Sequence, residues 1–348
     1  MEIPKNYSEL EGLNQSKLKR ILEHPKLFIE DQIESEFDEP KDHIDIGDAV
    51  DLLLTGDERK FHETFAVSEI ERPTGKMGDF CWAKFKYRDF DNADQLAYEE
   101  AEIKMPKTVE AYLEKFEKEG RAYYNELVNN EGKRVLTPKK NETIIRIVEA
   151  IRNNPSVYQH IDPTNEAYEI HFQVPISWRW ELPKTRREIW CKGLADVVKV
   201  HKETRMATII DVKTTRYSVG NFHYAFYAHR YDFQAAWYYV GLLQDFETKQ
   251  RLNIKGVNGE FLFVVGSSKF PDQCLVQKAT KKVLGAGWNG YTLNGKKYEG
   301  VSDALERYDF HTEIDKWDYK AEEYLNELNV EIPFNGELSE QSVLKVFN

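Results

Sequence analysis

Two acidic residues and a lysine lie on consecutive predicted strands. Asp196, in the segment GLAD, is expected at the end of one strand, and Asp211, Val212 and Lys213 at the end of the next. Side chains alternate across a strand, so Asp211 and Lys213 are expected on one face and Val212 on the other. Two carboxylates close together repel each other, and a divalent cation between them removes that repulsion. This spacing predicts a metal site with an amine beside it.

The residue types at this site indicate which metal and which reaction to expect. Carboxylate oxygens with room left for water suit Mg²⁺ or Mn²⁺, and no Cys/His cluster that would favour zinc accompanies them. We expect one or two ions, with Asp196 and Asp211 as ligands and the carbonyl of Val212 as a third. Lys213 would position or activate water and offset charge on a phosphate. The predicted chemistry is phosphodiester hydrolysis.

A helix after the second strand carries two further polar side chains. Gln234 and Tyr238 are four residues apart, which places them on the same helical face. Taken alone, they would be expected as core and rim residues of an amphipathic helix. Their position after the Asp-x-Lys strand favours a role in holding the metal shell or the DNA strand.

In this order, the motifs GxxD, DxK and QxxxY resemble those of the PD-(D/E)XK nuclease superfamily, within it the RecB-like group that carries the Gln/Tyr motif. The stretch DVKTTRYSVGNFHYAFYAHRYDFQAAWYYVGLL is similar to phage and prophage exonucleases of the exonuclease VIII (RecE-like) type. The resemblance covers roughly residues 10–270 and is strongest over 190–243. It implies an α/β nuclease core, a mixed central sheet flanked by helices, with an N-terminal helical part that roofs the active site.

The resemblance also suggests two further metal ligands. RecB-like nucleases usually carry a histidine in a G-x-x-x-H context, and Asp51 takes its place in the matching segment that begins at Gly47. A carboxylate can ligate Mg²⁺ at least as readily as an imidazole. Glu169 resembles the glutamate that the family places on the strand before the catalytic hairpin. The alternatives are a solvated residue on a charged helix for Asp51 and a structural role for Glu169.

The expected activity follows from the same resemblance. It is that of a Mg²⁺-dependent 5′→3′ exodeoxyribonuclease acting on double-stranded DNA ends in phage-type recombination, with a homo-oligomeric ring and a single-strand annealing protein as expected partners. Arg216, Tyr217 and Arg230 are expected to contact DNA. Two alternatives stay open: an endonuclease of the same superfamily in repair or defence, and a catalytically inactive module that binds DNA ends or a partner.

The hydrophobic pattern predicts the elements that position these residues. Helices are expected in the first 155 residues, and strands follow where the pattern changes toward period 2. A Ser16 N-cap and a break at Pro25 are expected in the first helical stretch. The expected helical stretches are 14–34, 46–56, 91–128, 141–155, 231–242 and 303–328, and the expected strands are 167–180, 187–200, 207–215 and 259–267.

These elements predict three parts of one integrated domain. Residues 1–155 form the helical N-terminal part, 156–280 the nuclease core and 281–348 a C-terminal helical extension. The strands 187–200 and 207–215 are joined by a polar connection short enough for an antiparallel hairpin.

The charge of the chain is unevenly distributed. The 348 residues carry 48 basic and 60 acidic side chains, a formal net charge of −12, which argues against coating nucleic acid by bulk electrostatics. Between Trp178 and Arg230, however, eleven Lys/Arg accompany five Asp/Glu. We expect these basic residues to gather around the metal site, with interleaved aromatic side chains, as a confined DNA path.

Cysteine content and apolar runs indicate the compartment. Three scattered cysteines give no disulfide framework, zinc knuckle or four-cysteine cluster. No secretion signal and no run of the ~20 apolar residues that a membrane helix needs is recognised. We therefore expect a cytoplasmic protein that does not contact a membrane.

Overall fold

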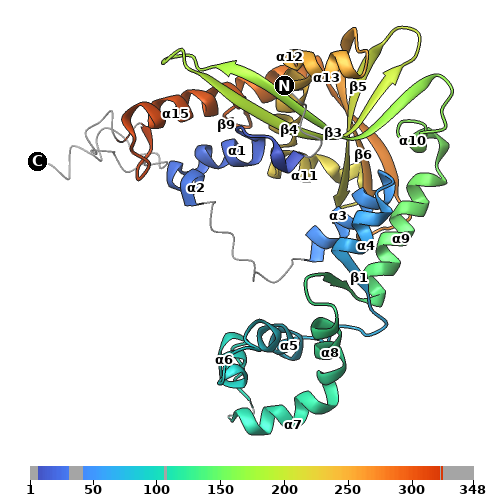
Figure 1. The fold of residues 1–348 in the computed structure, drawn as a ribbon, viewed down its shortest axis with the longest axis vertical. Helices are drawn as coiled ribbons and strands as arrows, with labels where there is room; N and C mark the ends of the chain where they lie inside the picture. Colours follow the sequence, from blue (N-terminus) through green and yellow to red (C-terminus); the bar gives the residue numbers. More distant parts are fainter. Residues whose placement is uncertain (1–6, 31–41, 106–107, 322, 324–348) are drawn as a thin grey trace, which may run out of the picture.

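The protein is built around a five-stranded mixed sheet (Figure 1). The computed structural model describes residues 7–30, 42–105, 108–321 and 323. The strand order is β3-β4-β5-β6-β7, in which β5 and β6 are parallel and the other pairs antiparallel. The bounds are β3 Tyr168–Glu181, β4 Glu188–His201, β5 Met206–Thr215, β6 Gly256–Ser267 and β7 Cys274–Thr280. The predicted mixed α/β architecture with flanking helices is confirmed.

Helices cover one face of the sheet through a large hydrophobic core. Leu18 and Ile21, Phe233 and Trp237, and Leu305 are fully or almost fully buried there, on three different helices. The helices of this face are α1 Gln15–Glu23, α2 Pro25–Glu30, α11 Phe222–Ala228, α12 Tyr231–Gln244, α14 Lys281–Asn289 and α15 Val301–Ile314. Because both faces of the sheet are buried, the central strands contain adjacent buried apolar residues, Ile209 and Ile210 in β5 and residues 261–265 in β6.

A second core lies on the opposite face of the sheet. Val50, Ile147 and Ile151 pack there against Val197 and Val264 of the sheet. The helices that supply this side are α3 Asp42–Leu54, α4 Glu58–Thr64, α9 Pro138–Arg152 and α10 Pro155–Tyr158. The stripe predicted for 141–155, with Ile144, Ile147, Val148 and Ile151, is therefore buried as expected.

A group of four helices packs around a core of its own, away from the sheet (Figure 1). Phe80, Tyr112 and Phe116 form the centre of this core, in edge-to-face contacts. The helices are α5 Lys76–Lys86, α6 Ala93–Glu100, α7 Val109–Glu119 and α8 Arg121–Asn129. A short parallel pair, β1 Phe65–Val67 and β2 Arg134–Leu136, connects this group to the rest.

The remaining described elements are short. They are η1 Tyr7–Glu9, η2 Val219–Asn221, α13 Phe246–Arg251, β8 Tyr291–Leu293 and β9 Lys296–Tyr298. The last two form an antiparallel hairpin between α14 and α15. In the described part of the chain, no helix combines the length and apolar character needed to cross a bilayer.

Several local features differ from the sequence-based expectations. Asn14, not Ser16, caps α1: its side chain accepts a hydrogen bond of 2.8 Å from the Lys17 backbone, because the helix begins one residue before Ser16. Strand β7 and helix α5 were not predicted. Residues 1–155 contribute to all three cores, whereas the three-part division of the chain stays a prediction. The end of the predicted helix 303–328 falls outside the described residues.

Candidate active site

The two predicted aspartates meet where β4 and β5 separate. The last residues that pair between these two strands are Val197 and Ile210, and the same register places Asp196 opposite Asp211 one step further. The Val212 backbone donates a hydrogen bond of 2.9 Å to Asp196 Oδ2. The prediction that both aspartates lie at strand ends is wrong, since β4 continues to pair with β3 and β5 with β6 beyond this point.

Lys213 lies on the same side of β5 as Asp211. Its Nζ is 2.5 Å from Asp211 Oδ2, which confirms the predicted alternation. Gln234 Nε2 donates a hydrogen bond of 2.9 Å to Asp211 Oδ1. Asp211 is only 2% exposed and Gln234 8%. The structure thus joins the DxK strand and the first residue of QxxxY in one buried polar cluster.

Tyr238, the second residue of the QxxxY motif, explains the glycine of the GxxD motif. A Cβ atom at Gly193 would lie 2.6 Å from the Tyr238 ring, closer than side-chain carbons approach. One residue away, Trp237 Nε1 donates a hydrogen bond of 3.0 Å to the Lys192 carbonyl. Helix α12 can therefore press against β4 only because residue 193 has no side chain. The sequence analysis included Gly193 in the GxxD motif but predicted no role for it.

Asp51 reaches the cluster from α3 on the far side of the strands. Its Oδ2 accepts a hydrogen bond of 2.9 Å from Gln173 Nε2, while its Oδ1 is buried without a hydrogen-bond partner. Gln173 lies on β3 between Phe172 and Val174, which pair with Val197 and Ala195 on either side of Asp196, and it has a left-handed φ of 47°. Sequence reasoning missed Gln173. Its signal was a polar residue on the strand that pairs with GLAD, but no spacing in the chain links it to Asp51.

The cluster carries more negative charge than its lysine can neutralise. Burial, together with the charges of Asp51 and Asp211, raises the pKa of Asp196 well above its usual range. Burial also raises the pKa of Asp211, and it raises that of Asp51 to about 6. Burial by itself lowers the pKa of Lys213, but the charges of Asp211 and Asp196 outweigh it and raise that pKa. Lys213 is therefore held as an ammonium group among three carboxyl groups.

The donor chemistry of this cluster fits a hard divalent cation. The groups that could hold it are the carboxylates of Asp196 and Asp211, the carbonyl of Val212 and the unpartnered Oδ1 of Asp51. A cation would neutralise the repulsion that raises their pKa values. Within the described residues, no three His, Cys, Asp or Glu side chains already converge at metal-binding distance. Instead, the Lys213 ammonium lies against Asp211, 3.5 Å from the Val212 carbonyl.

Glu169 is not brought to the cluster. It pairs with Val200 in the β3–β4 ladder, four residues from Gln173, which corresponds to about 13 Å along a strand. Both of its carboxylate oxygens accept hydrogen bonds from Arg205, at 2.8 and 2.9 Å. In this structure Glu169 binds Arg205 at the end of the sheet where β4 and β5 are connected, and it does not face the aspartates.

The residues predicted to contact DNA have different surroundings. Arg216 is exposed, and its guanidinium lies 5.4 Å from the Tyr217 ring. Arg230 has a left-handed backbone before α12, and its side chain bonds to Asp232 and to the Glu299 carbonyl. Burial and the nearby charges of Arg230 and Lys213 lower the pKa of Lys19 to about 8. Lys19 of α1 therefore adds a cation beside the site that the sequence analysis did not consider.

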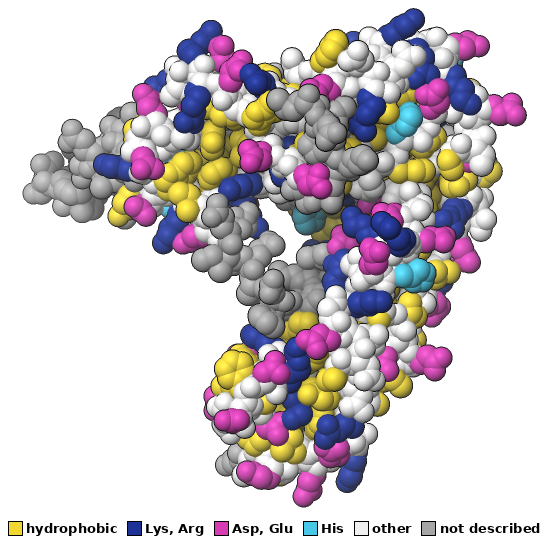
Figure 2. Space-filling view, viewed as in Figure 1, with side chains coloured by type: hydrophobic (Ala, Val, Ile, Leu, Met, Phe, Trp, Pro, Cys, Tyr) yellow, Lys and Arg dark blue, Asp and Glu magenta, His cyan; other side chains and the backbone are white. Residues whose placement is uncertain are grey.

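Three basic residues of segment 178–230 lie away from this cluster. Arg179 and Arg186 bind Glu188 and Glu181 at one end of the β3–β4 hairpin, and Arg205 binds Glu169 at the other. For these three the expected gathering around the metal site is wrong, because a 14-residue strand carries neighbours in sequence far apart in space. On the face shown in Figure 2, basic and acidic side chains are interspersed.

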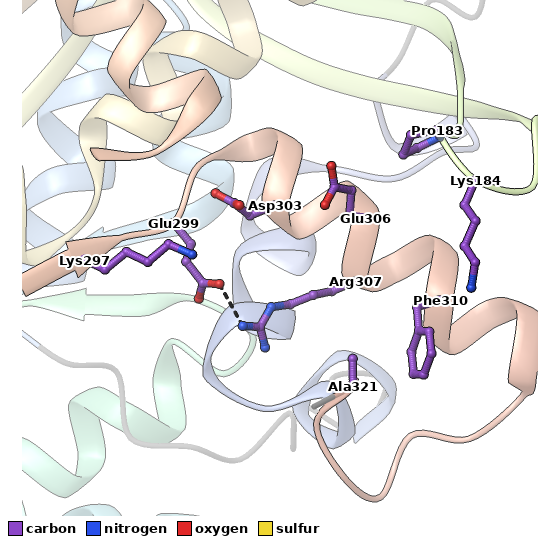
Figure 3. Close-up of a pocket in the computed structure, with 9 residues that line it drawn as sticks. All are labelled: Pro183, Lys184, Lys297, Glu299, Asp303, Glu306, Arg307, Phe310 and Ala321. Carbon is purple, nitrogen blue, oxygen red and sulfur yellow. Dashed lines mark hydrogen bonds and ion pairs between the residues drawn. The ribbon is translucent and has the colours of Figure 1, made fainter. Parts of the chain in front are cut away.

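A cavity of about 640 Å³ lies beside α15 and contains none of the predicted residues (Figure 3). Its lining mixes both charges, and Glu299 and Arg307 form an ion pair of 2.7 Å across it. The other lining residues are Pro183, Lys184, Lys297, Asp303, Glu306, Phe310 and Ala321. Because its charges compensate, the cavity has no preference for a polyanion, and the aspartate cluster stays the candidate active site.

Comparisons with known proteins give structural resemblances only. No protein-family model matches the chain, and no curated protein matches its sequence. A crystal structure from Eubacterium rectale described as a "Putative exonuclease" is similar, with 13% identity, a TM-score of 0.45 and coverage of 99% of this chain and 98% of that chain. The structure of SSO0001 has 10% identity, a TM-score of 0.22 and coverage of 67% and 80%. The aspartate cluster is therefore the basis for the function proposed below.

Proposed function

We propose that this protein is a metal-dependent nuclease that hydrolyses phosphodiester bonds in DNA. The observation that carries the proposal is the buried cluster in which Asp196 and Asp211 face each other and Lys213 lies 2.5 Å from Asp211. Carboxylates held together against their own repulsion cost stability, which is typical of sites that need the charge for catalysis. A structural ion pair would not require the second and third aspartates.

The chain's own residues have distinct tasks in this proposal. Asp196, Asp211 and the Val212 carbonyl would hold Mg²⁺ or Mn²⁺, as one or two ions. Asp51, on α3, would add a further carboxylate beside them. The chemistry that such a cation would supply is polarisation of a phosphoryl oxygen and a lower pKa of bound water. Lys213, as an ammonium group, positions water and offsets charge on the phosphate. Gln234 fixes the Asp211 carboxylate through its 2.9 Å hydrogen bond, and the buried Tyr238 ring fixes α12 against β4.

The finer assignment is a 5′→3′ exonuclease acting at double-stranded DNA ends. Its support is the sequence resemblance, in which the motifs GxxD, DxK and QxxxY follow in order. The same resemblance supports a role in phage-type recombination, a homo-oligomeric assembly, a single-strand annealing protein as partner and action in the cytoplasm of the host. All of these are part of the proposal.

Incubation with linear and with closed circular DNA tests the function. In Mg²⁺ or Mn²⁺, the proposal expects loss of linear DNA from its ends, intact circles and no reaction in excess EDTA. Labels on the 5′ or the 3′ ends report the polarity from the order in which they are released. Cutting of circles would replace the exonuclease with an endonuclease, and binding without cutting would replace it with a DNA-binding module.

A matched pair of lysine variants tests the site. Lys213→Ala should reduce hydrolysis by about 10² to 10³-fold, the usual loss for one group that stabilises charge in the transition state. Lys199→Ala is the control, because Lys199 is also buried and lies on the adjacent strand, where it bonds to the Gln159 carbonyl. An unchanged rate in folded Lys213→Ala would overturn the assignment of the site.

A further inference from the structure

A row of tyrosines begins directly after β5, the strand that carries Asp211 and Lys213, and ends at Tyr298 of β9. Tyr217 is 5.7 Å from Tyr224 between ring centroids, and Tyr227 is 6.4 Å from Tyr298. Tyr224 and Tyr227 are three residues apart on α11 and therefore neighbours on one helical face. We call these four residues the tyrosine ridge. Tyr224 is 58% exposed and Tyr227 37%, which is high for large aromatic side chains.

The tyrosine ridge is fixed to the aspartate cluster through buried aromatic contacts. Lys213 Nζ lies 5.3 Å from the Tyr231 ring, and Tyr231 stacks on Phe222 at 5.7 Å. Phe222 is the first residue of α11 and is only 1% exposed. The Ser267 hydroxyl donates a hydrogen bond of 2.7 Å to the Tyr217 carbonyl, which anchors the other end. The exposed rings are thus held by a rigid base beside Lys213.

Cations accompany the tyrosine ridge along its length. Arg216 lies beside the Tyr217 ring, and Lys296 lies 5.1 Å from the ring of Tyr298. Both side chains are exposed. Two acidic side chains near Tyr298 are already bound: Asp232 pairs with Arg230, whose guanidinium lies 5.5 Å from the Tyr298 ring, and Glu299 pairs with Arg307. The surface therefore combines exposed aromatic faces with exposed cations.

We propose that the tyrosine ridge binds unpaired nucleotides next to the candidate active site, with bases stacked on the rings and phosphates held by Arg216 and Lys296. This inference rests on the proposed nuclease function and adds a substrate class to it, namely DNA with a single-stranded stretch at the end. Exposed rings that alternate with cations are how proteins bind single strands without reading sequence. A paired duplex offers these rings no base faces, because its bases are stacked on each other.

Binding of a labelled single strand in excess EDTA tests the inference without any hydrolysis. The ligand is a fluorescent oligothymidylate of about 12 nucleotides, within the usual site size for such surfaces. The double variant Tyr224→Ala/Tyr227→Ala should raise the Kd at least tenfold, whereas Tyr224→Phe/Tyr227→Phe should stay within twofold of the unaltered protein. An oligonucleotide with 2-aminopurine should lose fluorescence when bound to the unaltered protein and keep it with the alanine variant.

An exposed aromatic residue outside the tyrosine ridge provides the control. Phe246 begins α13 and is 70% exposed, so Phe246→Ala removes a ring of the same kind without altering the tyrosine ridge. Equal thermal melting of the variants would establish that they are folded. The inference is overturned if the alanine variant binds as the unaltered protein does, if the phenylalanine variant loses as much, or if a duplex of the same length binds as tightly. A surface that bound only a protein partner would give the first of these results, or no binding of the oligothymidylate at all, which also overturns the inference.

The test separates this inference from the proposed nuclease function. A protein that binds the oligothymidylate through the tyrosines but cuts no DNA supports the tyrosine ridge and overturns the nuclease. A protein that cuts DNA, yet binds the oligothymidylate equally well without Tyr224 and Tyr227, supports the nuclease and overturns the tyrosine ridge.

Discussion

Buried aspartates in two regions of this protein have pKa values that are shifted in opposite directions. Asp309, on α15, has no exposed surface and accepts hydrogen bonds from the Lys184 and Thr185 backbone and the Thr185 hydroxyl, at 2.6 to 3.0 Å. Burial alone would raise its pKa, but these bonds outweigh burial and lower it. In the aspartate cluster, burial and neighbouring carboxylates raise the pKa values of Asp196 and Asp211 instead.

The two regions differ in the donors that their carboxylates meet. Asp309 meets three donors from one loop, which stabilises its ionised form and ties the β3–β4 connection to α15. The carboxylates of the aspartate cluster meet each other, and one oxygen of Asp51 meets no donor at all. A buried carboxylate whose donors outweigh burial is part of the fold, whereas a group of buried carboxylates whose donors do not outweigh it can be stabilised by a bound cation.

The largest expected effect is on hydrolysis and separates the two regions. Asp196→Ala should reduce the rate by about 10² to 10³-fold, because a charged group needed in the transition state is lost. Asp309→Ala should leave the rate of the folded protein within twofold. The measurement is cleavage of linear DNA in Mg²⁺ at a temperature where both variants are folded. Equal losses in the two variants would remove the distinction between the regions.

The second expected effect is on stability. Asp309→Asn removes the charge and replaces one of the two acceptor oxygens by an NH2 group that cannot accept, and should lower the free energy of unfolding by about 2 kcal/mol. Urea denaturation of the metal-free protein measures this loss. The exposed Asp318 provides the control, since Asp318→Asn should change stability by less than about 0.5 kcal/mol. An Asp309→Asn variant as stable as the unaltered protein would show that the charge and the second acceptor oxygen of Asp309 do not stabilise the fold.

The third expected effect is a gain in stability, in contrast to the loss expected for Asp309→Asn. Because the pKa of Asp51 is raised to about 6, its contribution to stability is present at low pH and is lost as pH rises from its unfolded value of ~3.9 through 6. Asp51→Asn should therefore stabilise the metal-free protein by about 2 kcal/mol at pH 8 and have little effect below pH 4. Denaturation in EDTA across this range measures it. The same gain at both ends would exclude titration of Asp51 as the cause.

The smallest expected effect is the stabilisation that a bound ion provides. Mg²⁺ at ten times its Kd should raise the free energy of unfolding by about 1.4 kcal/mol at pH 8. Asp196→Ala should abolish this increase, and Asp309→Asn should retain it, although it begins from a lower stability. Thermal melts with and without Mg²⁺ give both values. A Mg²⁺ effect that survives in Asp196→Ala would place the ion elsewhere.

The sequence determined the elements whose patterns are local. Alternation of apolar residues predicted β3, β4, β5 and most of β6, and helical periodicity predicted α9 and α12. Alternation also placed Asp211 and Lys213 on one face of their strand, and the 2.5 Å contact confirms it. These predictions succeed because periods of 2 and 3.6 residues are properties of the backbone alone.

Tertiary structure decided which distant residues meet. Gln173 contacts Asp51 across 122 positions, and Tyr227 and Tyr298 come together from α11 and β9. Likewise, Arg186 and Arg205 belong to one basic segment of the sequence but lie at opposite ends of a long hairpin. Such distances depend on strand length, register and helix packing, which are set by burial of the whole core. The sequence alone therefore identified the aspartates and the lysine, and the folded chain decided what surrounds them.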